Sequence, residues 1–191
     1  MKKKLLVLDN YDSFTYNLVH YIEAHPNYEV DVFRNDEISI EAVAAYDYIV
    51  LSPGPGLPAD AGIMEELIKT YASSKKILGV CLGMQAIGEV FGAKLHNLDK
   101  VYHGVATPIQ VLQENDSMYK DLPNTFVVGR YHSWVLDTED FPNELKITAI
   151  EAHNQIMSIT HQDYQVFGVQ YHPESILTEH GKKLITNFLE A

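Results

Sequence analysis

Cysteine is nearly absent from the sequence: Cys81 is the one thiol among 191 residues. One thiol cannot form an internal disulfide, and reduced cysteine is typical of proteins in the reducing cytosol. We therefore expect a cytoplasmic protein. Cys81 itself is either a small buried side chain or a reactive group, and its neighbours in the sequence must decide between the two.

Positive charge and long apolar runs are also scarce. The chain has 14 basic and 26 acidic residues, a formal net charge of −12, which opposes binding to nucleic acids and to anionic membranes. No apolar run is long enough to span a bilayer. Lys2-Lys3-Lys4 precedes only the short apolar run Leu5 to Leu8, so we expect no signal peptide. No cluster of metal ligands is visible, and we expect no metal site and no cofactor in this chain.

What is present describes a globular protein. Hydrophobic residues make up 46% and charged residues 21% of the chain, as in soluble folded domains. The length suits one domain with a single core. Because no repeat, linker or low-complexity tract interrupts it, residues 1–191 are predicted to form a single domain.

Apolar segments that suit buried strands alternate with segments that suit helices in the first half of the chain. Strands that are apolar throughout, separated by helices, predict a parallel sheet covered on both faces. Ser13 and Asp60 are expected to cap the first and third helices. The expected strands are residues 5–8, 28–33, 48–51 and 77–80, and the expected helices are residues 14–24, 39–45, 60–72 and 84–91.

After residue 91, strand-like segments follow one another with short links, which predicts antiparallel pairs. Thr178 is expected to cap a last helix that ends near Leu189. The chain is therefore predicted to be α/β, with a mostly parallel central sheet, helices on both faces and an antiparallel extension. The expected strands of the extension are residues 105–112, 126–131, 147–152, 156–160 and 166–171.

Cys81 stands where a predicted strand meets a predicted helix. Gly79-Val80-Cys81-Leu82-Gly83 is the nucleophile-elbow pattern with cysteine in place of serine. The turn strains the backbone at the nucleophile, so its flanking residues must be small, and Gly79 and Gly83 meet that need. The elbow also puts the sulfur at a helix N-terminus, which favours the thiolate. The pattern predicts a catalytic cysteine, and Gln85, one turn further along, is expected to face the same pocket.

A catalytic cysteine needs a base, and His172 is the best placed of nine histidines. It directly follows a predicted strand, and residues i and i+2 of extended backbone point the same way. Pro173 favours that extended geometry at His172. Glu174 is therefore expected to orient one imidazole nitrogen while the other faces Cys81. Alone, His172 and Glu174 would more often be a surface pair; beside an elbow they predict a triad.

The loop Ser52-Pro53-Gly54-Pro55-Gly56 follows the third predicted strand. Its glycines allow a close approach of the backbone to a ligand, and its prolines stiffen it. With the Leu82 N–H, its backbone N–H groups are predicted to stabilise an oxyanion. A plain strand-to-helix turn is an equally good reading of the loop taken alone. No Gly-Lys-Ser/Thr follows, so it is not a phosphate loop.

Three motifs together resemble the class I, triad-type glutamine amidotransferases. They are residues 79–85, Ser52-Pro53-Gly54-Pro55-Gly56 and Gln170-Tyr171-His172-Pro173-Glu174-Ser175. The opening from Leu8 to Leu18 resembles component II of anthranilate synthase and aminodeoxychorismate synthase, and Arg130-Tyr131-His132-Ser133 and residues 177–181 fit the same subfamily. The likeness covers the whole chain and implies the family's flavodoxin-like fold.

The resemblance implies a role for each matching residue. Cys81 would be the nucleophile, with His172 and Glu174 as its partners. A chorismate-binding component I subunit would take up the ammonia, and the turn Asn10, Tyr11, Asp12, Ser13 and Tyr16 is expected to contact it. Glutamine would be held by Gly54, Pro55, Gly56, Leu82, Gln85, Ser133 and Trp134.

Two residues depart from the family pattern. Trp134 stands where the family often has leucine, and a contact made through the backbone would tolerate that change. Val105 stands where the family often has lysine, so a lysine contact with the partner subunit has no counterpart here.

Three other functions compete with this prediction. The fold also suits a peptidase or γ-glutamyl hydrolase, although Gln85 and the Gly54-Pro55-Gly56 loop disfavour them. A non-catalytic regulatory homologue is disfavoured by the intact set of Cys81, His172 and Glu174. An amidotransferase of another pathway, such as guanylate or carbamoyl phosphate synthesis, is disfavoured by the opening motif.

Overall fold

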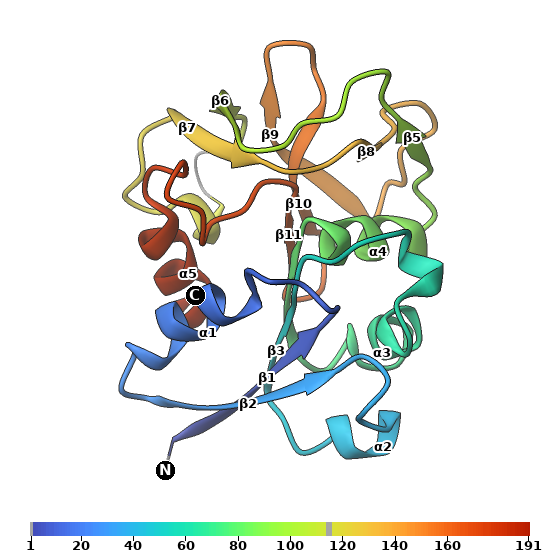
Figure 1. Cartoon of the computed structure of the whole chain (residues 1–191), viewed down its shortest axis with the longest axis vertical. Helices are drawn as coiled ribbons and strands as arrows, with labels where there is room; N and C mark the ends of the chain where they lie inside the picture. The colour runs from blue at the N-terminus through green and yellow to red at the C-terminus, as the bar shows by residue number, and fades with distance from the viewer. Residues whose placement is uncertain (1, 114–115) are drawn as a thin grey trace.

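The computed structural model of the chain describes residues 2–113 and 116–191. Within that part, nine strands form one sheet in the order β2-β1-β3-β4-β11-β10-β9-β6-β7 (Figure 1). The strands are β1 Lys3–Asp9, β2 Tyr28–Arg34, β3 Tyr48–Leu51, β4 Lys76–Val80, β6 Val105–Val111, β7 Thr125–Arg130, β9 Leu145–Glu151, β10 Ile156–His161 and β11 Val166–Val169.

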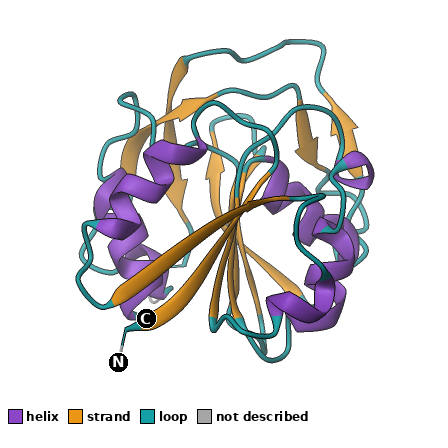
Figure 2. Ribbon diagram, turned by 60° about the horizontal axis from the view of Figure 1, so that its bottom comes forward, coloured by secondary structure: helices purple, strands orange, loops and turns teal. Residues whose placement is uncertain are grey.

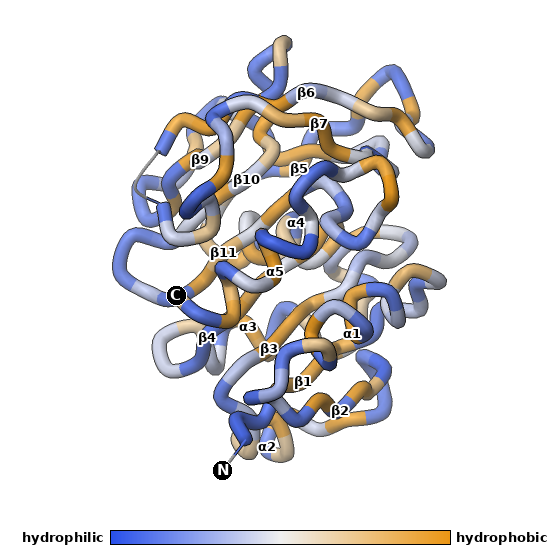
Figure 3. The backbone as a smooth tube through the Cα atoms, turned by 90° about the vertical axis from the view of Figure 1, so that its left-hand side faces the viewer, coloured by the Kyte–Doolittle hydropathy of each residue, from blue (hydrophilic) through white to orange (hydrophobic). Residues whose placement is uncertain are grey.

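The first five strands of this order are parallel. β1, β3, β4 and β11 are mostly buried, whereas β2, at the edge of the sheet, is partly exposed. In β1, Leu5 and Val7 join one core cluster, and Leu6 and Leu8 join the other. This alternation follows from the two-residue period of a strand. Figure 3 shows the hydrophobic colour along β1 and β3 and hydrophilic colour in the loops. The predicted parallel sheet, buried on both sides, is confirmed.

Helices cover both faces of the sheet (Figure 2). The core cluster on one face includes residues of α1 and α5, and the cluster on the other face includes residues of α2, α3 and α4. Figure 1 shows the two groups on opposite sides of the strands. The helices are α1 Thr15–Glu23, α2 Ile40–Val43, α3 Met64–Tyr71, α4 Leu82–Val90 and α5 Gly181–Glu190, with short 3-10 turns at Pro58–Asp60 and Ser117–Tyr119.

The remaining strands of the large sheet are antiparallel, as predicted. β10 pairs with β11 and β9, and β6 pairs with β9 and β7. A second sheet, β5 Leu95–Asn97 with β8 Trp134–Leu136, was not predicted. Three-residue strands are too short to show a two-residue period. β11 ends at Val169, two residues before the predicted end.

The three predicted helix caps are wrong. Ser13 does not cap α1; instead the Asp12 carboxylate accepts from the Phe14 N–H at 2.8 Å. Asp60 lies in a 3-10 turn, and α3 begins only at Met64. Thr178 precedes α5 by three residues, and its hydroxyl donates to the His172 carbonyl at 2.6 Å.

None of the helices within residues 2–113 and 116–191 is long and apolar enough to cross a membrane. The same residues contain no group of three or more potential metal ligands arranged to hold an ion.

Candidate active site

Cys81 lies between the end of β4 and the start of α4. Its φ of 52° and ψ of −101° fall outside the regions that non-glycine residues normally occupy. Such strain persists only where surrounding structure enforces it, and it concentrates at functional sites. A Cβ at Gly79 would lie 2.4 Å from the Gly83 carbonyl carbon, and one at Gly83 would lie 2.6 Å from the Leu51 carbonyl oxygen. Glycine is therefore required on both sides of the turn.

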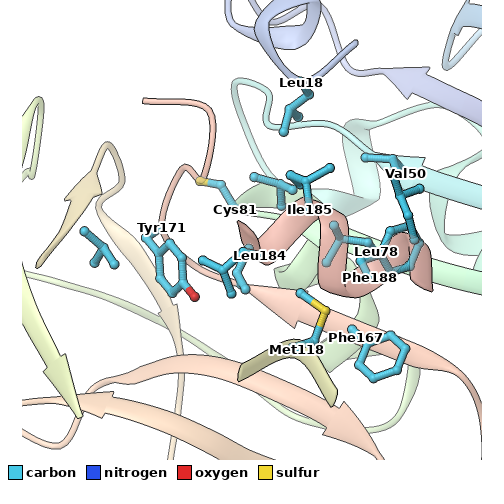
Figure 4. Packing of buried hydrophobic residues seen from close by; sticks show 14 of the residues in the cluster. Leu18, Val50, Leu78, Cys81, Met118, Phe167, Tyr171, Leu184, Ile185 and Phe188 are labelled. Atoms are coloured by element: carbon cyan, nitrogen blue, oxygen red, sulfur yellow. The ribbon is translucent and has the colours of Figure 1, made fainter. Parts of the chain in front are cut away.

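The Cys81 side chain lies at the boundary between the core and a cleft. It is 6% exposed and belongs to the core cluster shared by α1 and α5, and Figure 4 shows it between Tyr171 and Ile185. It also lines a cleft of about 390 Å³ together with His172. The other lining residues are Tyr11, Asp12, Ser13, Phe14, Pro53, Gly54, Pro55, His103 and Tyr131.

His172 and Glu174 form the predicted pair. His172 Nδ1 lies 2.6 Å from Glu174 Oε1, and both side chains are buried. The imidazole packs against the rings of Tyr131, at 4.8 Å between centroids, and Phe14, at 6.0 Å, and these two rings also contact each other at 5.5 Å. Nε2 makes no hydrogen bond to the described residues. Glu174 thus holds His172 by Nδ1 and leaves Nε2 open, on a ring that shares a cleft with Cys81, as a base and its orienting acid require.

The electrostatics at His172 favour the imidazolium. Burial by itself lowers the pKa of His172, but the Cys81 sulfur and the Glu174 carboxylate beside it outweigh burial and raise the pKa to about 10. Negative charge close to an imidazole stabilises its protonated form. The site therefore suits a thiolate–imidazolium pair, the form in which cysteine is nucleophilic.

The glycine-rich loop forms one wall of the cleft through Pro53, Gly54 and Pro55. A Cβ at Gly54 would lie 2.5 Å from the Asn10 carbonyl oxygen. The close approach that requires glycine here is thus to the chain's own backbone. Gly56 has a φ of 77° and lies outside the residues that line the cleft.

The comparisons with known proteins agree with this geometry. The sequence matches the model of the family described as glutamine amidotransferase class-I over residues 6–191. The chain belongs to the class I glutamine amidotransferases. The family and the flavodoxin-like α/β fold that the sequence predicted are thereby confirmed.

Curated relatives of this amidotransferase carry more specific names. It is 43% identical to anthranilate synthase component 2 of Pyropia yezoensis, covering 97% of this chain and 98% of that one. It is 41% identical to the aminodeoxychorismate/anthranilate synthase component 2 of Bacillus subtilis, covering 97% and 95%. It is also 44% identical to the bifunctional protein TrpGD of Thermotoga maritima, of which it spans only 32%.

Solved structures share the fold of the amidotransferase. A protein from Thermoplasma acidophilum, assigned as part of a GMP synthase, aligns with a TM-score of 0.88 at 23% identity, covering 99% of this chain and 93% of that one. A glutamine amidotransferase from Thermotoga maritima aligns with a TM-score of 0.76 at 16% identity, covering 100% and 82%. At these identities the likeness concerns the fold alone.

Five residues expected to hold glutamine do not line the cleft of the amidotransferase: Gly56, Leu82, Gln85, Ser133 and Trp134. Leu82 is the first residue of α4, so its backbone N–H has no partner within the helix. The Gln85 side chain is 3% exposed, and its nitrogen donates to the Trp134 carbonyl at 2.9 Å and to Gln170 at 3.2 Å. These residues could contact glutamine directly only from outside the set of residues that line the cleft.

The turn expected to meet a partner is divided between surface and interior. Tyr11 and Tyr16 are 51% and 59% exposed, and Asp12 and Ser13 line the cleft. Asn10, which was expected to contact the partner, is instead buried: it is 2% exposed, and its side-chain nitrogen donates to the Ser52 carbonyl at 2.8 Å. Asn10 therefore supports the loop at Gly54 from inside and does not present a contact surface.

His132 is a buried histidine that stays neutral. Burial and the neighbouring Arg130 guanidinium lower its pKa to about 3. The unfolded chain, in contrast, binds a proton at a pKa of about 6.5. The contribution of His132 to stability is therefore fully present above about pH 6.5 and is lost as the pH falls towards 3.

We expect the free energy of unfolding to fall by about 2 kcal/mol more between pH 7 and pH 5 in the natural protein than in His132→Asn, which has no titrating group there. Denaturant unfolding at the two pH values measures this difference. His172 acts in the opposite sense, since its raised pKa makes its contribution complete below about pH 6.5 and lost as the pH rises towards 10. It is common to both proteins and cancels. Equal slopes would show that the fold does not lower the pKa of His132.

Proposed function

We propose that this chain is the glutaminase subunit of a chorismate-aminating synthase. The observation that carries the proposal is the strained Cys81, which shares a cleft with a His172 held by Glu174 at 2.6 Å. In this proposal the Cys81 thiolate attacks the side-chain carbonyl of glutamine, and backbone N–H groups at Leu82 and the Gly54 loop stabilise the oxyanion. The imidazolium of His172 protonates the departing nitrogen, which leaves as ammonia.

The second half of the reaction restores the enzyme. His172, now neutral, takes a proton from water, and the resulting hydroxide attacks the thioester carbonyl. The C–S bond breaks, glutamate leaves, and the sulfur departs as the thiolate beside the imidazolium. Glu174 holds the same nitrogen of His172 throughout, so the other nitrogen serves both steps.

The ammonia needs a protected acceptor. Ammonia released into neutral water becomes ammonium, which is not nucleophilic, so a partner that receives it through a shielded path removes that loss. Relatives named anthranilate synthase component 2 and aminodeoxychorismate/anthranilate synthase component 2 support a chorismate-binding component I as that partner. The product would then be anthranilate, 4-amino-4-deoxychorismate or both, as the partner dictates.

The test is to co-purify the chain with its component I and supply glutamine and chorismate. Release of glutamate together with aminated chorismate supports the proposal. Hydrolysis of peptides or γ-glutamyl peptides without glutaminase activity would favour a hydrolase. Failure of a glutamine-mimicking chloroketone to label Cys81 would favour a non-catalytic homologue. Co-purification with a synthase of another pathway would show that the ammonia goes to that enzyme and not to a component I.

An exposed apolar side chain beside the cleft supports a docking surface for this partner. Ile176 is 98% exposed and directly follows residues 172–175, the triad loop that carries His172 and Glu174. It lines a second cavity of about 390 Å³ with Phe14 and Tyr131. Phe14 and Tyr131 also line the cleft that contains Cys81. A partner seated over Ile176 and Tyr16 would therefore cover the exit from the glutamine site.

We expect Ile176→Asp to weaken binding of component I about tenfold or more, because a charge replaces an apolar anchor in the interface. Titration calorimetry measures the affinity, and labelling of Cys81 by the chloroketone should be unchanged. The matched control is Leu112→Asp. Leu112 is 42% exposed and directly follows β6. Arg130 pairs with Val105, at the other end of that strand. Equal affinities of the two variants would exclude Ile176 from the interface.

A further inference from the structure

A buried chain of polar groups ends at the Cys81 sulfur. The side-chain nitrogen of Gln170 lies 3.6 Å from that sulfur, and the Gln170 oxygen accepts from the Gln85 nitrogen at 3.2 Å. The same Gln85 nitrogen donates to the Trp134 carbonyl at 2.9 Å. Gln170 is fully buried and Gln85 is 3% exposed, so bulk water does not compete for these bonds.

A second pair of side chains holds the Trp134 carbonyl from the other direction. His132 Nδ1 lies 3.0 Å from that oxygen, and the Arg130 Nε–H donates to His132 Nε2 at 3.0 Å. Arg130 is fully buried, lies 3.5 Å above the ring of Tyr102, and donates to the side chain of Gln155. The antiparallel half of the sheet thus anchors a carbonyl close to the elbow.

The Trp134 carbonyl fixes the donor and the acceptor of every hydrogen bond in this series of side chains, because a carbonyl oxygen only accepts. The His132 Nδ1 must carry a proton, which leaves Nε2 as the acceptor that Arg130 requires. The Gln85 nitrogen must face the carbonyl, since its oxygen would be repelled there. The Gln170 oxygen must then face Gln85, and this settles an amide orientation that atomic positions alone leave open. A Gln170 N–H therefore points at Cys81.

We propose that Gln170 is a catalytic residue that donates this N–H to the Cys81 thiolate, and that Gln85, His132 and Arg130 are positioning residues that aim it. The inference rests on the proposed role of Cys81 as nucleophile. A donor to the sulfur stabilises the negative charge, both before attack on glutamine and when the sulfur leaves the thioester. It also gives Gln85 a role that does not need direct contact with glutamine.

The test follows the reactivity of the single cysteine. We expect Gln170→Met, which keeps the length of the side chain but has no N–H, to raise the pH midpoint of Cys81 alkylation by iodoacetamide by about one unit or more. Gln110→Met, at an exposed position of β6, is the control and should keep the natural midpoint. An unchanged midpoint in folded Gln170→Met would overturn the proposal.

The contact between His132 and the Trp134 carbonyl is tested by two substitutions of His132. His132→Phe keeps a ring beside Tyr102 but cannot donate to the Trp134 carbonyl, so it should raise the midpoint as Gln170→Met does. His132→Asn places an amide nitrogen near the position of Nδ1 and should restore much of the natural midpoint. Equal midpoints for the two variants would contradict a positioning role, and this pair keeps the proposal testable if Gln170→Met does not fold.

The alkylation readout needs neither glutamine nor component I, so it separates the two proposals. A raised midpoint in a protein that does not hydrolyse glutamine would support the Gln170 contact and reject the proposed function. Normal glutaminase kinetics together with an unchanged alkylation midpoint in Gln170→Met would support the proposed function and reject the Gln170 contact. In the assembled synthase, Gln170→Met should lower kcat for glutamine more than it changes KM, because the bond acts on the sulfur and not on the bound substrate.

Discussion

Cys81→Ala is expected to abolish glutamine-dependent amination of chorismate, by about 10⁴-fold or more, and to leave amination from added ammonium intact. The first result follows because removal of the nucleophile removes the thioester route entirely. The second follows because added ammonium supplies, outside the cleft, the ammonia that the site would otherwise make. Steady-state rates of the assembled synthase with each nitrogen source measure both.

The control for this experiment is the protein's own fold. Alanine at position 81 removes one buried sulfur, which costs little beyond its packing, so thermal unfolding and affinity for component I should stay close to those of the natural protein. Loss of amination with both nitrogen sources, in a variant that still binds its partner, would contradict the role of Cys81 as a dedicated ammonia generator. Retention of the glutamine-dependent rate would reject it as the nucleophile.

The parts of the fold that could be predicted are those that local pattern determines. Three apolar strands, the alternating strand of residues 28–33 and their intervening helices followed from periodicity, and the glycines on both sides of Cys81 identified the elbow. The caps failed for a different reason. Ser13, Asp60 and Thr178 are all good cap formers, but neighbouring carboxylates, a 3-10 turn and the His172 carbonyl use those positions differently. Tertiary partners, which the sequence does not show, decided each case.

The site was predictable to the same extent. Cys81 was singled out by the glycines that flank it, His172 by the predicted strand directly before it, and Glu174 by its i, i+2 spacing from His172 in extended backbone. The amide chain through Gln170 was missed, although Gln170 stands two residues before His172. Its meaning depends on Gln85, Trp134 and His132, which come together only when the antiparallel half folds against α4. No spacing along the chain signals that contact.

Gly181 ends the motif 177–181 that fits the subfamily, but no structural role was predicted for it, and its substitution is expected to have the second largest effect. It is the first residue of α5, and a Cβ there would lie 1.8 Å from the Pro173 carbonyl oxygen and 2.9 Å from its carbon. Both are backbone atoms, so no rotamer change relieves the clash. We expect Gly181→Ala to lower the free energy of unfolding by about 3 kcal/mol, measured by urea titration.

The same substitution should reach the chemistry, because Pro173 lies between His172 and Glu174. The segment of residues 172–175 must move away from α5. The hydrogen bond that the Gly129 N–H donates to the Thr178 hydroxyl, and the one that this hydroxyl donates to the His172 carbonyl, must stretch with it. A displacement of about 1 Å at a catalytic group typically costs about 100-fold in rate, so glutaminase activity should fall by that order at temperatures where the variant is folded. Lys182→Ala, one residue further along and exposed, should change neither quantity. Full activity in Gly181→Ala would mean that the clash is relieved by a shift of α5 alone, and that the triad loop does not depend on the helix behind it.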